Sequence, residues 1–380
     1  MRIAWFRTTP VDVADPLDET AALIAELRAS HAIDVFVEAD AHDFVWRHAL
    51  IPWELCVYEL DDTRAHQFIW AYLVNYPGAV LLESARVHHG WGGALSREGR
   101  LDDYLASLRF DDRTRPASVL QVPLYASRLV VTPHMALAIE LQETYPGACV
   151  RCAPLGAAAG EPVELHAHPP GRQHVLRVAA TNDRIVPLER AAARARAAGA
   201  EIELMVAQPA ARLLHECDVI VDLSWPPFQK TPTPAMAAMA AGKPLVILES
   251  DATADWPALN PQTWLPRDAI ASRAPIAVTI DPRDEEHSLM QALRRLAIDG
   301  ELRERLGQAA NAWWKQHATP QRASAAWMPI LEQAARLAPP PRPVNWPAHL
   351  DADGTELART ILAEFGVTSD LLPTNNQAPS

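Results

Sequence analysis

The sequence predicts an α/β protein with two domains, each built on a parallel sheet that helices cover on both faces. A length of 380 residues allows two domains of roughly 100–200 residues each, and a hydrophobic content of 49% is enough for two packed cores. Short apolar strands alternate with amphipathic helices, and this alternation stops once and then restarts. Continuous apolar strands that alternate with helices are typical of parallel sheets.

The first series of elements is expected to form a domain over residues 1–154. Its apolar runs are expected as strands at Ile3–Phe6, Ile33–Val37, Leu55–Tyr58, Ala79–Leu82 and Arg128–Thr132. Helices are expected between these strands, at Leu17–Ala29, Arg64–Asn75, Leu101–Leu108 and Pro133–Thr144.

Residues 155–172 are rich in Ala, Gly, Pro and His, have no periodicity, and are expected to link the domains. The second domain is expected over 173–318. Its predicted strands are Val175–Ala180, Glu201–Val206, Val219–Leu223, Leu245–Leu248 and Ile276–Ile280. Its predicted helices are Leu188–Ala198, Pro209–Glu216, Pro234–Ala241, Glu286–Ile298 and Glu301–His317. C-terminal helices are expected over 319–366, followed by a disordered polar tail at 367–380.

The formal net charge of −13 argues against nucleic acid as a partner, because phosphate backbones need a basic footprint. The same charge gives little support to docking on a membrane surface. The N-terminal residues lead straight into a strand without the apolar core of a signal peptide, and no run of about 18 apolar residues occurs. A cytoplasmic protein is therefore expected. Only three of the 34 basic residues are lysines, which indicates GC-rich bacterial coding.

Four cysteines are spread along the chain. Cys56 and Cys217 lie in apolar strand-like runs, which predicts buried free thiols. Cys149 and Cys152 have C-x-x-C spacing, but no second Cys or His pair follows at zinc spacing. A metal or redox role stays open for this pair, and plain strand residues are the preferred interpretation. We therefore expect no metal site and no cofactor.

The turn after the first strand, Arg7–Asp12, contains no glycine. A dinucleotide-binding turn needs glycine there, because only glycine lets the backbone approach a pyrophosphate. The sequence therefore argues against NAD-dependent chemistry.

Two segments carry the most specific pattern. Cys217–Leu248 combines a buried strand, a proline-rich loop, a small-residue helix, Gly-Lys-Pro and a second buried strand, a unit that builds a ligand crevice at strand ends. Leu55–Gly90 combines a strand, an acidic turn, a Trp-Ala-Tyr-Leu helix, Tyr-Pro-Gly, an apolar strand and two histidines. Together they resemble the group 1 glycosyltransferases of the GT-B class.

This resemblance covers most of residues 1–337 and implies two Rossmann-like domains that face each other across a cleft. It implies a retaining, metal-independent transferase. Such an enzyme moves a sugar from a nucleoside diphosphate sugar to an acceptor. The acceptor is unknown, and a glycan or a lipid-linked molecule would suit the family.

On the acceptor side, the resemblance points to His66, to Glu83 and to the pair His88 and His89, for which it implies a catalytic role. The family often has His-Asp where this chain has Leu82-Glu83. A plain structural role remains open for each histidine. We expect His88 and His89 at the passage from a strand into a loop, where at most one of them would face a crevice.

On the donor side, Arg184 matches a basic residue of the family and is the candidate contact for the diphosphate. A departing diphosphate builds negative charge that fixed cations or helix N-termini must stabilise. Trp225, Lys230 and Thr231 occupy the donor-sugar loop, in which Lys230 replaces the family's acidic residue. The change removes an acceptor for a sugar hydroxyl but provides a cation that could contact phosphate.

Two alternatives to an active transferase stay open. The charge reversal at Lys230 and the changed Leu82-Glu83 favour a degenerate relative that binds a nucleotide, a sugar or a partner protein without turnover. A nucleotide-sugar epimerase of the same fold would need carboxylates in the cleft, and the sequence places none there.

Overall fold

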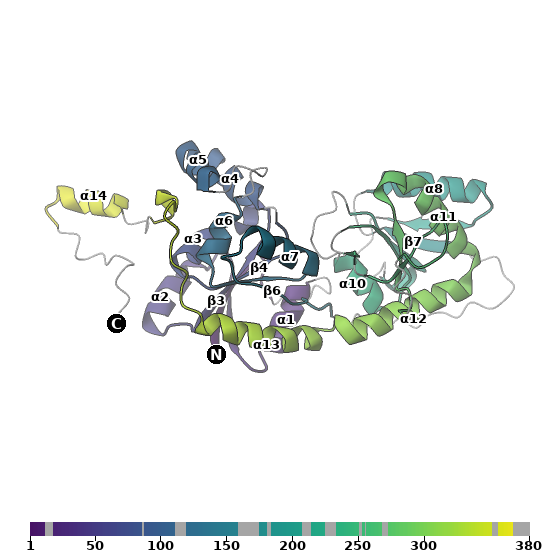
Figure 1. The fold of residues 1–380 in the computed structure, drawn as a ribbon, viewed down its shortest axis with the longest axis horizontal. Helices are drawn as coiled ribbons and strands as arrows, with labels where there is room; N and C mark the ends of the chain where they lie inside the picture. Colours follow the sequence, from purple (N-terminus) through teal and green to yellow (C-terminus); the bar gives the residue numbers. More distant parts are fainter. Residues whose placement is uncertain are drawn as a thin grey trace.

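The computed structural model describes residues 1–11, 18–85, 87–110, 119–158, 175–180, 184–206, 214–224, 233–250, 253–254, 256–267, 273–351 and 356–367. Within these ranges the chain forms two six-stranded parallel sheets, each with its own set of helices (Figure 1). The predicted fold class is therefore confirmed.

The first sheet has the strand order β2-β1-β3-β4-β5-β6. Its strands are β1 (Arg2–Phe6), β2 (Ala32–Phe36), β3 (Leu55–Leu60), β4 (Ala79–Leu82), β5 (Leu129–Thr132) and β6 (Val150–Cys152). The chain passes from β1 outward to β2 and then returns to β3 on the other side of β1. This reversal creates a switch point between β1 and β3, where ligands of open α/β sheets bind beyond the strands' carboxyl ends.

The helices of this half are α1 (Glu19–Leu27), α2 (His42–Leu50), η1 (Arg64–His66), α3 (Gln67–Asn75), α4 (His88–Arg97), α5 (Leu101–Phe110), α6 (Gln121–Ala126) and α7 (Met135–Thr144). They leave two cores, one on each face of the sheet. Phe6 and Tyr58 belong to the core that includes residues of α2 and α3, and Trp5 and Val57 to the core that includes residues of α1. Alternate residues of one strand thus fill opposite cores, which explains the continuous apolar runs.

The second sheet has the strand order β11-β12-β10-β9-β7-β8. Its strands are β7 (Leu176–Ala180), β8 (Ile202–Met205), β9 (Val219–Asp222), β10 (Leu245–Leu248), β11 (Ala258–Leu259) and β12 (Ala277–Ile280). Its helices are α8 (Ile185–Ala197), α10 (Thr233–Ala240), η3 (Pro282–Asp284), α11 (Glu285–Ile298) and α12 (Gly300–His317). The path from β7 to β8 and back to β9 creates a second switch point, between β7 and β9.

Gly-Lys-Pro ends α10 as the sequence predicts. Gly242 has a φ of +67°, the left-handed conformation that glycine adopts after a helix. Its amide donates to Met239 O and the next amide, of Lys243, to Ala238 O. The buried Lys243 Nζ donates to Cys217 O at 2.8 Å, which ties the helix stop to the start of β9.

The two halves are joined by two crossings of the chain. The linker residue Ala157 donates its amide to Ala318 O, and its carbonyl accepts from Trp314 Nε1 of α12 at 3.2 Å. Helix α13 (Pro320–Arg336) continues from α12 but packs on the first sheet (Figure 1), with the rings of Trp327 and Trp5 5.8 Å apart. Helices α12 and α13 therefore contact one half each and connect the two.

After α13 the chain runs back along the first half to η4 (Ala348–Leu350) and α14 (Glu356–Glu364). Trp346 meets Phe110 of α5 edge to face at 5.4 Å. His349 lies against Asp103 and Ser107 of the same helix, with its Nδ1 3.6 Å from Asp103 Oδ1. The segment between α13 and α14 is thus anchored on α5.

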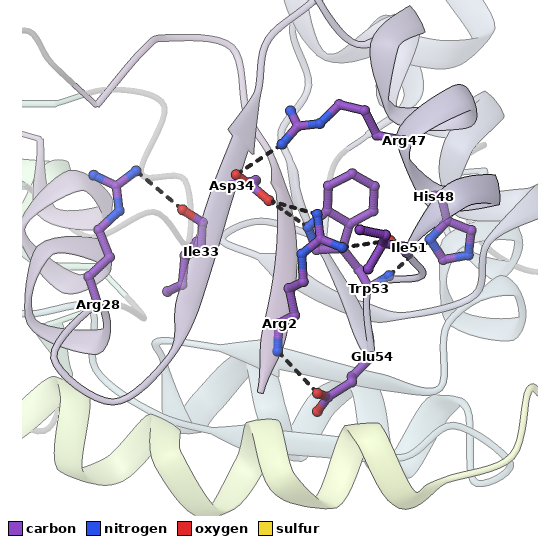
Figure 2. Close-up of polar contacts among 9 residues, drawn as sticks. All are labelled: Arg2, Arg28, Ile33, Asp34, Arg47, His48, Ile51, Trp53 and Glu54. Carbon is purple, nitrogen blue, oxygen red and sulfur yellow. Dashed lines mark hydrogen bonds and ion pairs between the residues drawn. The ribbon is translucent and has the colours of Figure 1, made fainter.

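Helix α2, which the sequence did not predict, is held on its inner side by polar contacts and has an exposed apolar side chain on its outer side. Figure 2 shows Asp34 of β2 accepting from Trp53 Nε1 at 2.8 Å and pairing with Arg2 and Arg47. The two guanidinium groups lie over the Trp53 ring, 4.4 and 5.2 Å from its centre. On the outer face Trp46 is 75% exposed, whereas Trp53 is 4% exposed.

The predicted elements that lie in the described residues are present within three residues of their expected bounds. Besides α2, the sequence missed α4, α6 and the two-residue β11. The predicted helix at Pro209–Glu216 lies mostly outside the described residues, as do most of the predicted linker at 155–172 and the tail from 368.

Candidate functional site

The candidate donor residue Arg184 stands at the carboxyl edge of the second sheet. It is the residue before α8, the helix that follows β7. Its Nη1 donates to Leu223 O, beyond the end of β9, at 3.3 Å. Its Nη2 pairs with Glu285 Oε2, at the start of α11, at 2.9 Å. The guanidinium therefore spans the switch point between β7 and β9, with its side chain 31% exposed.

A turn beside Arg184 is held by Asp222, the last residue of β9. Its Oδ1 accepts from the Ser224 amide at 3.0 Å and from Ser224 Oγ at 2.6 Å. Ser224 therefore closes a turn directly beyond the end of β9. Trp225, Lys230 and Thr231 lie beyond it, outside the described residues.

The histidine pair does not lie where the sequence predicts. His88 and His89 are the first two residues of α4, not a passage from a strand into a loop. Because they are helical, they do not alternate between two faces of a strand. Their rings meet edge to face, 5.6 Å apart. The prediction failed because Trp91 and Leu95, which α4 buries, are separated by glycines, and glycine lowers the helix signal.

The N-terminus of α4 is capped by Asp62, from the loop after β3. Asp62 Oδ1 accepts from the amides of His89 and Gly90 at 2.5 and 2.9 Å, and its Oδ2 contacts His89 Nδ1 at 2.8 Å. A side chain at Gly90 would meet Thr63 O and Asp61 O at 3.1 and 3.2 Å. The glycine therefore lets α4 lie directly on this loop.

The other acceptor-side candidates surround the same loop. His66 in η1 contacts Thr63 Oγ1 through Nδ1 at 2.7 Å. His88 contacts the Tyr104 hydroxyl of α5 through Nε2 at 3.2 Å. Glu83 directly follows β4, the neighbour of β3 in the sheet. The structure thus brings all four acceptor-side candidates to the carboxyl edge of β3 and β4. No hydrogen bond or ion pair of the described ranges joins them to Arg184.

Sequence reasoning missed a pair of ionisable residues at the switch point of the first sheet. Arg7 directly follows β1, and Glu59 is the next-to-last residue of the adjacent β3. Arg7 Nε lies 3.3 Å from Glu59 Oε1, and Arg7 Nη2 contacts both oxygens of Asp18 at 2.7 and 2.8 Å. Glu59 Oε1 also accepts from Trp5 Nε1 at 2.7 Å.

A charged residue inside the apolar run LCVYEL was the available signal, because glutamate is almost never buried without a partner. The Arg7 and Glu59 side chains are 4% and 13% exposed. Burial raises the pKa of Glu59 to about 7, and Glu83 and Asp18 add to the rise, while Arg7 and the Trp5 hydrogen bond oppose it. This carboxyl group therefore changes protonation near neutral pH.

Asp18 also accepts from the amide of Ala21 and so caps α1. Arg7 thereby ties the end of β1 to the start of α1. With two carboxylates and one guanidinium, this place is unsuited to a diphosphate and suited to a hydroxyl group or a proton.

No group of three His, Cys, Asp or Glu side chains within the described ranges could hold a metal ion. Cys149 and Cys152 are free thiols, the first directly before β6 and the second its last residue, and the free Cys56 and Cys217 are buried as predicted.

The helices of the described segments include none that is both long and apolar enough to span a bilayer.

No protein-family profile matches the chain. No curated protein matches it in sequence. Among solved structures, it is similar to Anabaena HepE in complex with UDP and glucose, with a TM-score of 0.55 and 10% identity over 87% of this chain and 99% of that one. HepE in complex with UDP-glucose gives a TM-score of 0.54 and 12% identity over 87% and 99%. WaaG, a glycosyltransferase involved in lipopolysaccharide biosynthesis, has a TM-score of 0.48 and 10% sequence identity over 85% of this chain and 98% of that one.

The HepE matches span nearly that whole protein, so they include both sheets and the connections between them. Two Rossmann-like halves with parallel six-stranded sheets give this chain the GT-B fold of glycosyltransferases.

Proposed function

We propose that the protein is a glycosyltransferase that moves a sugar from a nucleoside diphosphate sugar to an acceptor. The observation that carries the proposal is the place of Arg184. Its guanidinium lies at the switch point of the second sheet, beside the start of α8 and next to Leu223 O. A cation beside helix N-termini stabilises the negative charge that grows on a departing diphosphate.

The solved complexes suggest which donor to test first. HepE is described with UDP and glucose and with UDP-glucose. A uridine diphosphate sugar is therefore the first donor for this chain. The proposed chemistry needs no metal ion, because Arg184 and the helix N-termini supply the positive charge.

A panel of nucleoside diphosphates in a thermal-shift assay, followed by diphosphate release from the matching sugar nucleotides, tests the proposal. We expect UDP to raise the melting temperature and wild-type protein to release UDP slowly from a UDP-sugar. Arg184→Ala should weaken the shift and lower release at least tenfold. EDTA should change neither result.

Arg194→Ala is the matched control. Arg194 lies in α8, the helix that begins directly after Arg184, and pairs with Glu286, the neighbour of the residue that pairs with Arg184. Its side chain is 61% exposed, so its loss should leave binding and release unchanged. Equal effects of the two variants, or no response to any nucleotide, would contradict the proposal.

A second candidate function is nucleotide or partner binding without turnover. One contact favours it: Glu285 already occupies Arg184 Nη2 at 2.9 Å and would compete with a diphosphate. Under this alternative, a nucleotide raises the melting temperature but no sugar nucleotide is consumed. The Glu285→Gln variant distinguishes the two candidate functions. Loss of the ion pair with Arg184 should strengthen nucleotide binding in either case, but it should raise turnover only if the protein is an enzyme.

We also propose an acceptor that binds at the first sheet, where the histidines and Glu83 lie. A glycan or lipid-linked acceptor and a cytoplasmic location remain part of this proposal. Binding of candidate acceptors to His88→Ala and His66→Ala variants, measured by calorimetry, would test where the acceptor lies.

A further inference from the structure

Glu59 lies where an open α/β sheet binds its ligands. The connections from β1 and from β3 leave in opposite directions, and Glu59 stands at the carboxyl end of β3 beside Arg7 at the end of β1. In this architecture the crevice beyond such a switch point is the usual binding place. The histidine candidates lie near the same edge, but none of them lies at this point.

Only one of the two carboxyl oxygens of Glu59 is in contact with an assigned donor in the described residues. Its Oε1 accepts from Trp5 Nε1 at 2.7 Å and lies 3.3 Å from Arg7 Nε. Within the described residues, no donor is assigned to Oε2. The carboxyl group is therefore fixed in orientation by Trp5 and Arg7 while Oε2 stays open to a proton.

The positive charge near Glu59 offsets only part of the negative charge of its carboxylate form. From β1 it faces Arg7, from the start of α1 Asp18, and from the end of β4 Glu83. Arg7 Nη2 makes two contacts with Asp18, at 2.7 and 2.8 Å, both shorter than the 3.3 Å contact of Arg7 Nε with Glu59. The guanidinium therefore neutralises Asp18 first. The raised pKa of Glu59, about 7, agrees with this distribution of charge.

We propose that Glu59 is a catalytic base that accepts the proton of the acceptor hydroxyl. This inference deepens the proposed function and rests on it. The acceptor oxygen forms a bond to the anomeric carbon, and the bond from that carbon to the diphosphate oxygen breaks. The electron pair of the broken bond leaves with the diphosphate, whose charge Arg184 offsets, and the hydroxyl proton passes to Glu59 Oε2.

A base on the acceptor side assists attack from the face opposite the leaving group, which inverts the anomeric carbon. The inference therefore departs from the retaining class that the sequence resemblance implies. It also explains why the turn after β1 carries an arginine bound to carboxylates instead of a glycine-rich phosphate loop.

Diphosphate release from a UDP-sugar, with water as the simplest acceptor, tests the inference in wild-type, Glu59→Gln and Glu54→Gln proteins between pH 5.5 and 9. Glutamine keeps the shape and the Trp5 contact but cannot take a proton. Glu54 is exposed at the opposite end of β3 and is the matched control. Nuclear magnetic resonance of the sugar first released reports its anomeric configuration.

We expect wild-type kcat to rise through about pH 7 and then level off. Glu59→Gln should lower kcat by about 10²–10⁴-fold, the usual share of a general base, and remove this rise, while its UDP thermal shift stays equal to wild type. Glu54→Gln should match wild type. The first released sugar should have inverted configuration.

Three results would overturn the inference while the proposed function stands: near-wild-type release by Glu59→Gln, an unchanged pH profile, or a retained configuration. Nucleotide binding without release by the wild-type protein would overturn the catalytic role of Glu59 and favour the binding-only function. Absence of both binding and release would overturn both proposals.

Discussion

At the residue scale, the buried carboxyl group of Glu59 makes the stability of the fold depend on pH. Its pKa in the folded chain, about 7, exceeds its ordinary value of 4.5 because burial disfavours the charged form. The native state therefore holds this proton more tightly than the unfolded chain does. The stabilisation is complete below pH 4.5 and is lost as the pH rises toward 7.

The first prediction follows from this shift. Between pH 4.5 and 7 the unfolding free energy of the wild type should fall by about 3 kcal/mol relative to Glu59→Gln, since each pKa unit corresponds to about 1.4 kcal/mol. Above pH 7 the difference should stay constant. Urea unfolding of both proteins at several pH values measures it, and a difference that does not change with pH would contradict it.

The same residue illustrates what the sequence could indicate. Glutamate in the run LCVYEL is visible in the sequence, but its partners Arg7, Asp18 and Trp5 come from other elements. Their approach depends on parallel pairing of β1 with β3, in which Phe6 lies opposite Tyr58. The sequence thus shows an unusual glutamate within an apolar run but does not show which residues contact it.

At the element scale, α2 and the residues after it contain one exposed tryptophan, Trp46, and one buried tryptophan, Trp53. The Trp53 ring lies against two guanidinium groups and its Nε1 donates to Asp34 (Figure 2). The side chain of Trp46, in contrast, is 75% exposed. Trp53→Ala should therefore lower the unfolding free energy by about 3–5 kcal/mol, the usual cost of removing a buried aromatic residue. Trp46→Ala should change it by less than about 0.5 kcal/mol. Chemical denaturation of both variants checks the contrast.

A second contrast lies within α12. A methyl group at Gly307 would overlap Gly242 O at the end of α10, whereas one at Gly300 would come no closer than 3.5 Å to Arg303. Gly307→Ala should destabilise the protein by about 1–3 kcal/mol, because α10 and α12 would have to separate. Gly300→Ala should be near neutral or stabilising. Similar melting temperatures for both variants would show that the contact between α10 and α12 is loose.

The histidine pair shows the limit of prediction at this scale. Local composition located β4 at its exact bounds, because four apolar residues follow Tyr-Pro-Gly. It did not locate α4, whose start depends on Asp62 from a loop 27 residues away. A cap supplied by a distant element leaves no signal next to the helix it begins.

At the scale of the whole molecule, the linker packs closely against the start of α13 where the chain crosses between the two halves. Gly156 has a φ of +82°, and a side chain there would lie 2.8 Å from Thr319 O and from Ala323. The linker and the start of α13 are thus in direct contact, and α13 continues along the first sheet (Figure 1).

Gly156→Ala should destabilise the protein more than Gly99→Ala. Gly99 has a similar φ of +72° but no neighbour within 4 Å, so its variant has only the backbone strain, about 1 kcal/mol. At Gly156 crowding adds to this strain, and we expect about 2–4 kcal/mol in total. Calorimetric unfolding of both variants measures the difference, and equal losses would mean that the crossing adapts.

The sequence by itself determined the two parallel sheets, the order of most strands and helices, and the helix stop at Gly242. These depend on local periodicity, on glycine conformations and on apolar runs, which neighbouring residues specify. Only the tertiary structure decided that Arg184 meets Leu223 O and Glu285, that α4 begins at His88, and that Glu59 lies between Trp5 and Arg7. The reason is physical: these contacts join strand ends that are far apart in the chain, and parallel pairing brings such ends to one edge only after the sheet has formed.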